Sequence, residues 1–306
     1  MQTPWGDLVV SDAHVHFFSR RFFDSLAGQC RKSVEDVAQA VEWDLPAANP
    51  GELATRWAEE LDAHGISRAA LIASVAGDEA SVLQAATAQP GRFFSYAMFN
   101  PLEPDAPSRA RSAFEAGMSA LCLFPAMHRF SMHDERVAAI IEIAASWPHR
   151  AVFVHCGVLT VGVRKKLGLA SPFDMRYSNP LDLHPIALRF PKLPFIVPHF
   201  GAGHFREALM LADLCPNVYL DTSSTNSWMR YEELDLPTVF RRALAVAGPR
   251  RLLFGTDSSF FPRGWNDAIF EQQSLVLHSL DIGAADARLI FSENLENLFG
   301  STALSQ

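Results

Sequence analysis

Two histidines separated by one residue, His14 and His16, stand where a predicted strand ends, in the segment Asp12-Ala13-His14-Val15-His16. Residues two apart in a strand point to the same side, so both imidazoles can converge on one point. Two imidazoles aimed together suit a divalent metal ion, although a lone pair of this kind is a weak signal because histidines are also ordinary hydrogen-bonded residues. Asp12 precedes His14 by two residues and shares its strand face. We expect Asp12 to support the ligands rather than to bind the metal.

Side chains of related chemistry stand at the ends of three other predicted strands. His155 ends the segment VFVH, His199 ends IVPH, and Asp257 follows LFGT. Catalytic residues of barrel enzymes come from the carboxyl ends of several different strands, whereas a structural histidine has no reason to prefer that end. Together with the histidine pair, these residues predict one functional site.

The elements that must position these residues are short apolar runs that alternate with amphipathic stretches. Runs rich in β-branched and aromatic residues, closed by polar or Gly and Pro signals, are typical of strands buried on both faces of a parallel sheet. We expect strands at residues 7–12, 68–74, 92–99, 119–124, 151–155, 194–199, 217–222 and 251–256. Helical patterns lie between them, at residues 49–64, 78–89, 105–117, 134–147, 205–215 and 237–248.

This alternation predicts an α/β fold, a single-domain (β/α)8 TIM barrel over residues 1–306. Parallel strands need crossover helices, and eight such units close a barrel. An open, doubly wound sheet is the alternative. Two segments, 17–50 and 157–184, are longer than ordinary connections, and in a barrel both would lie at the carboxyl end of the strands, where active-site loops sit.

Cations and aromatic residues in the loops favour recognition of an organic anion. Arg164 and Arg176 lie in the segment 157–184, whereas Arg263 and Trp265 lie in the segment after the eighth strand. We take these four residues as candidates for binding a substrate carboxylate. The alternative is that each charge is only an exposed loop residue, as Lys and Arg usually are.

Composition argues against several other classes of protein. The formal net charge is −8, from 26 basic and 34 acidic residues, and no Lys/Arg-rich run offers a surface for nucleic acid. The four cysteines are far apart and form no CxxC pair, which favours a reducing, cytoplasmic setting without a disulfide framework. The N-terminus shows no basic segment followed by an apolar stretch, and the most apolar run, near 151–163, is too short to span a bilayer, so we expect no membrane insertion.

At these residues the sequence resembles the amidohydrolase superfamily, and within it the branch that includes aminocarboxymuconate-semialdehyde decarboxylase. The likeness rests on the HxH of the first strand, the histidines that end the fifth and sixth strands, the GTD of the eighth, and a segment SENLENLF that is similar to the closing helix of that branch. It implies a metal-dependent barrel in which the ligands are His14, His16, His155 and Asp257, while His199 is a catalytic residue near the metal, with ligation by His199 left open.

The resemblance also bears on the number and kind of metal ions. The fourth strand, SALCLFP, has no lysine of the kind that bridges two metals, which favours a site for one ion. Three imidazoles and one carboxylate leave a position for water and suit Zn²⁺, with Mn²⁺ as the alternative.

Two reactions and one non-catalytic role are compatible with these ligands. In a hydrolase, metal-activated water attacks a lactone, amide or ester of a small carboxylate-bearing molecule. Asp257 accepts the proton of the water, and His199 stabilises or protonates the developing oxyanion. In a decarboxylase, the same site binds an aromatic or muconate-type carboxylate, and one of these two residues protonates carbon. A structural metal with no bound water is the third role. We place hydrolysis first, and the expected partners are a small organic acid or lactone substrate and, in a homo-oligomer, further copies of the chain.

Overall fold

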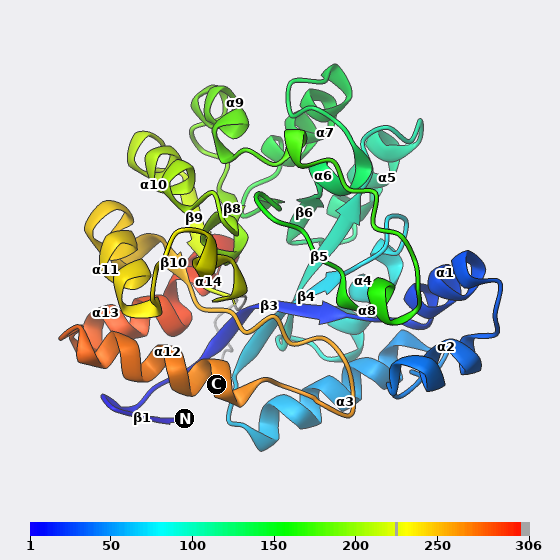
Figure 1. Cartoon of the computed structure of the whole chain (residues 1–306), viewed down its shortest axis with the longest axis horizontal. Helices are drawn as coiled ribbons and strands as arrows, with labels where there is room; N and C mark the ends of the chain where they lie inside the picture. Colours follow the sequence, from blue (N-terminus) through cyan, green and yellow to red (C-terminus); the bar gives the residue numbers. More distant parts are fainter. Residues whose placement is uncertain (224–225, 301–306) are drawn as a thin grey trace.

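The computed structural model describes residues 1–223 and 226–300, which form a barrel of parallel strands enclosed by helices (Figure 1). Within these residues the strands pair in chain order, each parallel to the next. The barrel strands are β3 (Ser11–Phe17), β4 (Arg68–Ala73), β5 (Phe93–Phe99), β6 (Ala120–Leu123), β7 (Ala151–Val154), β8 (Phe195–Val197), β9 (Val218–Asp221) and β10 (Leu252–Leu253).

The sheet closes on itself between its first and last strands. The amide of His16 donates to the carbonyl of Ser258 at 2.7 Å, and the amide of Asp257 donates to the carbonyl of His14 at 3.0 Å. A parallel bridge also pairs Val15 with Ser258. An open sheet would leave such edge groups unpaired. The prediction of a (β/α)8 barrel is therefore confirmed, and the open-sheet alternative is wrong.

Helices follow the strands and cover the outside of the barrel (Figure 1). Side chains of Asn49, Asp134 and Asp235 accept hydrogen bonds from backbone amides in the first turns of three of them, which satisfies groups that a helix start leaves free. All six predicted helices are present, with ends within two residues of the predicted positions. The outer helices are α3 (Pro50–Ala63), α4 (Glu79–Ala88), α5 (Ala106–Glu115), α7 (Glu135–Ala145), α9 (His184–Arg189), α10 (Phe205–Leu214), α11 (Leu236–Ala247) and α12 (Asp267–Ser279).

Alternate strand residues fall into two separate buried layers. Ile72 and Tyr96 belong to a cluster that fills the barrel interior, whereas Leu71 and Ala97, their chain neighbours, pack outward against the helices. This arrangement is typical of a parallel sheet covered on both faces. It explains why the strand segments are almost continuously apolar.

The amino end of the barrel is closed by the C-terminal helix. This helix, α14 (Asn294–Phe299), places the ring of Phe299 5.0 Å from Phe94 and 5.6 Å from Tyr96. The Asn294 side chain donates to the carbonyl of Leu252 at 2.8 Å and so ties the helix to the last strand. The opposite, carboxyl end of the strands remains open for a site.

The first barrel strand begins later than the sequence pattern predicts. The predicted strand covers 7–12, whereas β3 spans Ser11–Phe17. The residues before it form a small antiparallel pair, β1 (Gln2–Thr3) and β2 (Gly6–Asp7). Val9 is 61% exposed, and unbroken burial starts only after it. The two histidines therefore lie within the strand and not beyond its end.

The two long segments fold into helices at the carboxyl end of the barrel. Segment 17–50 contains α1 (Arg20–Cys30) and α2 (Val34–Val41), and segment 157–184 contains α8 (Gly162–Lys166), which packs on α2 (Figure 1). No helix in the described part of the chain is both long and apolar enough to cross a membrane. Apolar side chains from both segments form a cluster separate from the barrel core, and its buried members are Phe22, Phe23, Leu26, Ala27, Val37, Ala38, Val41 and Val163.

Candidate functional site

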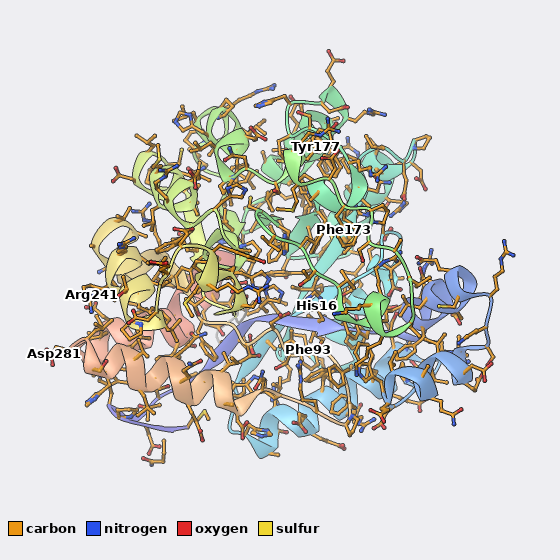
Figure 2. All side chains as sticks on the ribbon, in the orientation of Figure 1. His16, Phe93, Phe173, Tyr177, Arg241 and Asp281 are labelled. Atoms are coloured by element: carbon orange, nitrogen blue, oxygen red, sulfur yellow. The ribbon has the colours of Figure 1, made fainter. Side chains whose placement is uncertain are left out.

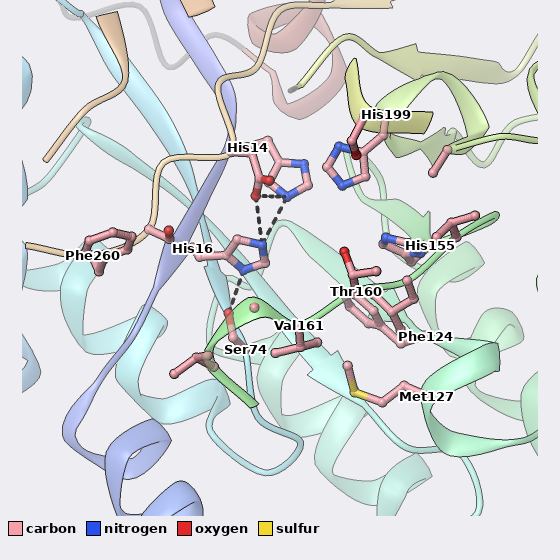
Figure 3. A pocket seen from close by; sticks show the side chains of 18 of the residues that line it. His14, His16, Ser74, Phe124, Met127, His155, Thr160, Val161, His199 and Phe260 are labelled. Carbon is pink, nitrogen blue, oxygen red and sulfur yellow. Dashed lines mark hydrogen bonds and ion pairs between the residues drawn. The ribbon is translucent and has the colours of Figure 1, made fainter. Parts of the chain in front are cut away.

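A bulge in β3 turns the two histidines toward the carboxyl mouth of the barrel. The pairing of β3 with β4 shifts register between Asp12 and Val15. As a result, two consecutive residues face the barrel interior: Ala13 packs there, and the ring of His14 lies 5.4 Å from that of Phe153. The Nε2 atoms of His14 and His16 are 3.4 Å apart, and Figure 3 shows both rings beside one cavity. Bulges commonly re-aim side chains next to active sites.

Asp257 joins the two histidines from the segment after β10. Its Oδ1 lies 3.2 Å from His16 Nε2 and 3.7 Å from His14 Nε2, and one ligand atom from each residue lies within 4.8 Å of the others. Ligands of one tetrahedral zinc ion stand about 3.3 Å apart, given metal–nitrogen bonds of about 2.0–2.1 Å. The spacing therefore fits one divalent ion. Asp257 has a φ of 60°, and backbone strain of this kind clusters at functional sites.

Hydrogen bonds behind each ring determine which nitrogen faces the cluster. His14 Nδ1 donates to Asp221 Oδ2 at 2.7 Å. His16 Nδ1 is 2.7 Å from Ser74 Oγ, whose hydroxyl donates to the carbonyl of Ile72, so the imidazole is the donor here too. Both rings thus carry a proton on Nδ1 and direct an Nε2 lone pair at the other ligands. Two lone pairs and a carboxylate that face one another repel unless a cation lies between them, so this donor set fits a metal ion.

Asp221 is a candidate functional residue that sequence reasoning missed. It ends β9, its side chain is fully buried, and its Oδ1 accepts a hydrogen bond from the amide of Ser223 at 2.6 Å. Burial alone would raise the pKa of Asp221, but the interaction with His14, including its hydrogen bond, outweighs burial and lowers the pKa. An acid at the carboxyl end of the seventh barrel strand is the signal that could have identified it.

Asp12 supports the site from the outer side of β3. Its Oδ1 accepts the amides of His14 (2.9 Å) and Thr256 (3.1 Å), and its Oδ2 accepts the Thr256 hydroxyl and Trp265 Nε1 (2.8 Å). Burial raises the pKa of Asp12 to about 6 even though these bonds favour the charged form. The prediction that Asp12 shares the strand face of His14 is wrong, because the bulge breaks the alternation. Asp12 therefore holds the backbone of the site rather than an imidazole ring.

His199 lies beside His14 at the inner wall of the cavity (Figure 3). It has a φ of 54°, in a left-handed turn directly after β8, and its ring centroid is 4.9 Å from that of His14. His199 Nδ1 is 2.9 Å from Ser223 Oγ and 3.1 Å from the Ser223 carbonyl oxygen. Burial and the neighbouring His14 lower the pKa of His199, so the ring is mainly neutral at pH 7.

His155 lies on the same wall, outside the group formed by the two β3 histidines and Asp257. Its ring stacks on Phe124 at 5.3 Å and is 5.4 Å from the ring of His199. Burial lowers the pKa of His155 well below its usual value, and its buried Nδ1 has no hydrogen-bond partner among the described residues. Such a buried nitrogen costs about 1–3 kcal/mol and needs an explanation, such as a bound group. Metal ligation by His155 stays a prediction.

His14, His16 and Asp257 form the floor of a cavity of about 500 Å³, and His155 and His199 line the adjoining wall. Pockets that enclose a small organic ligand have volumes of roughly 300–1,000 Å³. In Figure 2 His16 lies near the middle of the molecule, whereas Arg241 and Asp281 lie at its edge. Thr160 and Val161, from the loop after β7, also line this cavity (Figure 3). The aromatic members of the cavity wall are Phe18, Phe22, Trp43, Phe124, Trp228, Tyr231 and Phe260.

A family model described as amidohydrolase matches residues 11–300, nearly the whole chain. The chain belongs to the amidohydrolase family. One curated relative, Protein fluG from Emericella nidulans, is 33% identical over 85 residues. That match covers 28% of this chain and 10% of the relative, so the chain spans only a small part of that protein.

Solved structures show that the barrel is shared with other proteins. An uncharacterised TIM-barrel protein from Bordetella bronchiseptica is 18% identical, with a TM-score of 0.65, and the match covers 95% of this chain and 98% of that one. A probable 2-pyrone-4,6-dicarboxylic acid hydrolase from Acinetobacter baumannii, with citric acid bound, is 13% identical, with a TM-score of 0.60 and coverages of 96% and 100%. An amidohydrolase from Burkholderia multivorans with bound zinc is 15% identical, with a TM-score of 0.58 and coverages of 95% and 99%. At these identities the likeness shows the fold.

Two arginines that the sequence offered as substrate ligands lie away from the pocket of this amidohydrolase-family barrel. The side chain of Arg176 is 82% exposed and pairs with Asp174 at 2.6 Å. Arg164 donates to the side chain of Gln29 at 2.6 Å and to the carbonyl of Ala170. Both arginines therefore stabilise the loop after β7, and neither lines the described cavity.

The other two candidates lie behind the cavity wall. Arg263 is exposed, donates to Ser259 Oγ at 2.9 Å and lies over the ring of Phe260 at 4.6 Å. Trp265 is buried against the barrel, where it binds Asp12. The described cavity lining includes two other cations, Lys166 and Arg230. Sequence reasoning did not single out Arg230, although a cation among aromatic residues in the segment after the seventh barrel strand was a usable signal.

Proposed function

We propose that this protein is a metal-dependent hydrolase that cleaves a lactone, ester or amide of a small carboxylate-bearing molecule. The observation that carries this proposal is the convergence of His14 Nε2, His16 Nε2 and Asp257 Oδ1 at the spacing of ligands around one ion, at the floor of a cavity. Zn²⁺ is the proposed ion, with Mn²⁺ as the alternative. The family match and the hydrolase name of one structural neighbour support hydrolysis.

The residues at the floor have different roles in the proposed reaction. When bound, a divalent ion supplies Lewis-acid chemistry, which lowers the pKa of water to about 7 and polarises a carbonyl group. Burial would raise the pKa of Asp257, but the surrounding His16, His14 and His199 lower it, so the carboxylate is ionised at neutral pH and accepts the proton of the attacking water. Asp257 then returns this proton to the leaving group.

His199 is assigned to the developing oxyanion. This role requires the tautomer in which the Ser223 hydroxyl donates to Nδ1 at 2.9 Å and Nε2 carries the proton that points toward the cavity. The Ser223 carbonyl oxygen, 3.1 Å from Nδ1, accepts a hydrogen bond only from the other tautomer, whose Nε2 is a lone pair. His155 lines the same wall and is proposed as a further ligand. His14 and His16 hold the ion, while Asp221 and Ser74 keep their Nε2 lone pairs directed at it.

Decarboxylation is the second candidate, favoured by one feature of the cavity. Its walls are mainly apolar and aromatic, and such walls solvate the charge of a carboxylate poorly. Loss of CO₂ disperses that charge, so the walls favour this reaction. In this reaction the carboxylate binds at the floor, and Asp257 or His199 delivers a proton to carbon.

A paired assay separates the two reactions. Protein loaded with one equivalent of Zn²⁺ or Mn²⁺ is given aryl lactones and esters, with acid release followed by titration, and aromatic and muconate-type carboxylates, with CO₂ monitored. Hydrolysis predicts acid release without CO₂, lost on chelation and restored by metal. CO₂ release from the carboxylates without ester cleavage would establish the second candidate instead. Full hydrolytic activity in protein shown by elemental analysis to hold no metal would contradict the metal-dependent mechanism.

A further inference from the structure

One wall of the cavity is a ladder of nearly parallel aromatic rings. Phe18 stacks on Phe22 at 4.0 Å and on Trp43 at 5.4 Å, and Trp43 stacks on Phe260 at 4.3 Å, with interplanar angles of 5°, 14° and 12°. The rings come from the segments after β3 and β10, and all four line the cavity. Aromatic rings attract one another beyond the burial of their apolar area, in stacked and in edge-to-face arrangements. The ladder therefore favours a ligand with an aromatic body.

Like the ring ladder, the rest of the cavity wall between the floor and the rim has no charged side chains. It includes Phe124, Met127, Leu159, Val161 and Trp228, with a few hydroxyl groups elsewhere in the lining. Apart from the imidazoles, the charged groups in the described lining are a carboxylate at the floor and the cations of Lys166 and Arg230. A carboxylate held between the apolar walls would lose its hydration without a partner. An anionic group of a ligand therefore has its place at these cations or at the floor.

The two cations are exposed, which places them at the rim of the cavity. Arg230 lies in the segment η4 (Asn226–Tyr231), donates to Tyr231 Oη at 3.2 Å and sits 5.1 Å from the centre of that ring. Lys166, at the end of α8, donates to the carbonyl of Val41 at 3.4 Å. Within the described part of the chain, neither cation forms an ion pair. Both therefore remain available to a carboxylate, and Arg230 offers the planar donor pair that suits it.

We propose that the ligand of this site is an aryl-bodied monocarboxylate, with its aromatic part against the ring ladder and its carboxylate at the rim, on Arg230. The group that reacts would then be a second, uncharged carbonyl that reaches the floor, remote from the carboxylate. This inference rests on the proposed hydrolytic function and narrows its substrate to aryl lactones, esters or amides that carry one remote carboxylate. Small dicarboxylates, which lack an aromatic body, fit the apolar walls poorly.

Binding of unreactive probes tests the inference without turnover. Calorimetry on the metal-loaded protein compares 4-phenylbutyrate with its neutral isostere 4-phenylbutanamide and with succinate. We expect 4-phenylbutyrate to bind at least about tenfold more tightly than either. Arg230→Gln should bring the acid and the amide within about threefold of each other. Arg176→Gln is the matched control, because it removes an exposed arginine that lies outside the cavity, and it should leave all three affinities unchanged.

Two results would overturn the inference. One is equal affinity of wild-type protein for the acid and the amide. The other is binding of 4-phenylbutyrate that chelation abolishes while Arg230→Gln leaves it intact, since the carboxylate would then bind at the floor. Selective binding at the rim together with failure to cleave aryl esters that carry a remote carboxylate would support the subsite and contradict the proposed hydrolase, so the two proposals fail separately.

Discussion

Replacement of Asp221 by asparagine should weaken metal binding, although it removes none of the proposed metal ligands. The carboxylate accepts from His14 Nδ1 at 2.7 Å and from the Ser223 amide at 2.6 Å, and the Asp221 and His14 side chains are 0% and 1% exposed. An asparagine in this place can turn either its oxygen or its amide nitrogen toward the imidazole, and both arrangements are unfavourable.

With the amide nitrogen toward His14, the ring must move its proton to Nε2, which removes the lone pair directed at the metal. With the oxygen toward His14, the asparagine NH₂ meets the N–H of Ser223, and two buried donors face each other. Loss of a partner behind a ligand histidine typically costs 10–100-fold in metal affinity, which is about 1.4–2.7 kcal/mol. We expect a loss in this range for Asp221→Asn.

The assay is competition for Zn²⁺ against a chelator of known affinity, with thermal unfolding followed in parallel to show that the variant is folded. Asp78→Asn is the matched control, because Asp78 is also a buried acid but contacts Ser19 and Ser81, away from the histidines. Its zinc affinity should equal that of the wild type. A folded Asp221→Asn protein that binds zinc within about threefold of the wild type would refute the reasoning.

Three further predictions follow from the same geometry. His14→Ala and His16→Ala should each remove the metal and the activity while the far-UV circular dichroism stays unchanged, because the site lies at the barrel mouth; loss of that signal would instead indicate a structural site. Asp257→Asn should lower kcat by at least about a hundredfold while elemental analysis still finds metal. Near-normal turnover of this variant would show that another residue carries the proton. Asp134→Ala should lower the free energy of unfolding by about 1 kcal/mol at pH 7, because Asp134 caps α7. Hydrogen bonds from Arg136 lower the pKa of Asp134 to about 2, so this stabilisation is present above pH 4 and declines as the pH falls toward 2. Urea unfolding at pH 7 that shows no difference in stability between Asp134→Ala and the wild type would contradict the prediction.

Much of the fold can be predicted from local patterns in the sequence. The apolar runs that became β4, β5, β6, β7 and β9 are recognisable because strands buried on both faces must be apolar along their length. The six predicted helices are recognisable from their apolar periodicity and their start and stop signals. Polar residues at the ends of these runs were a second readable signal. The carboxyl ends of parallel strands meet at one end of a barrel, so the convergence of His14, His16 and Asp257 follows from topology alone.

Other features depended on contacts that no local pattern records. The bulge in β3 breaks the period-two rule, so Asp12 turns outward to Trp265 while His14 turns inward. Asp221 is 207 residues from His14 in the chain, and nothing in its own neighbourhood indicates which ring it orients. The loops of the carboxyl face follow no repeating pattern, and only their packing placed Arg230 on the cavity lining and Arg176 away from it. Sequence alone therefore determined the barrel and the residue types at its mouth. Tertiary structure decided which of these side chains meet, because a side chain's direction depends on long-range pairing and packing that residue spacing does not encode.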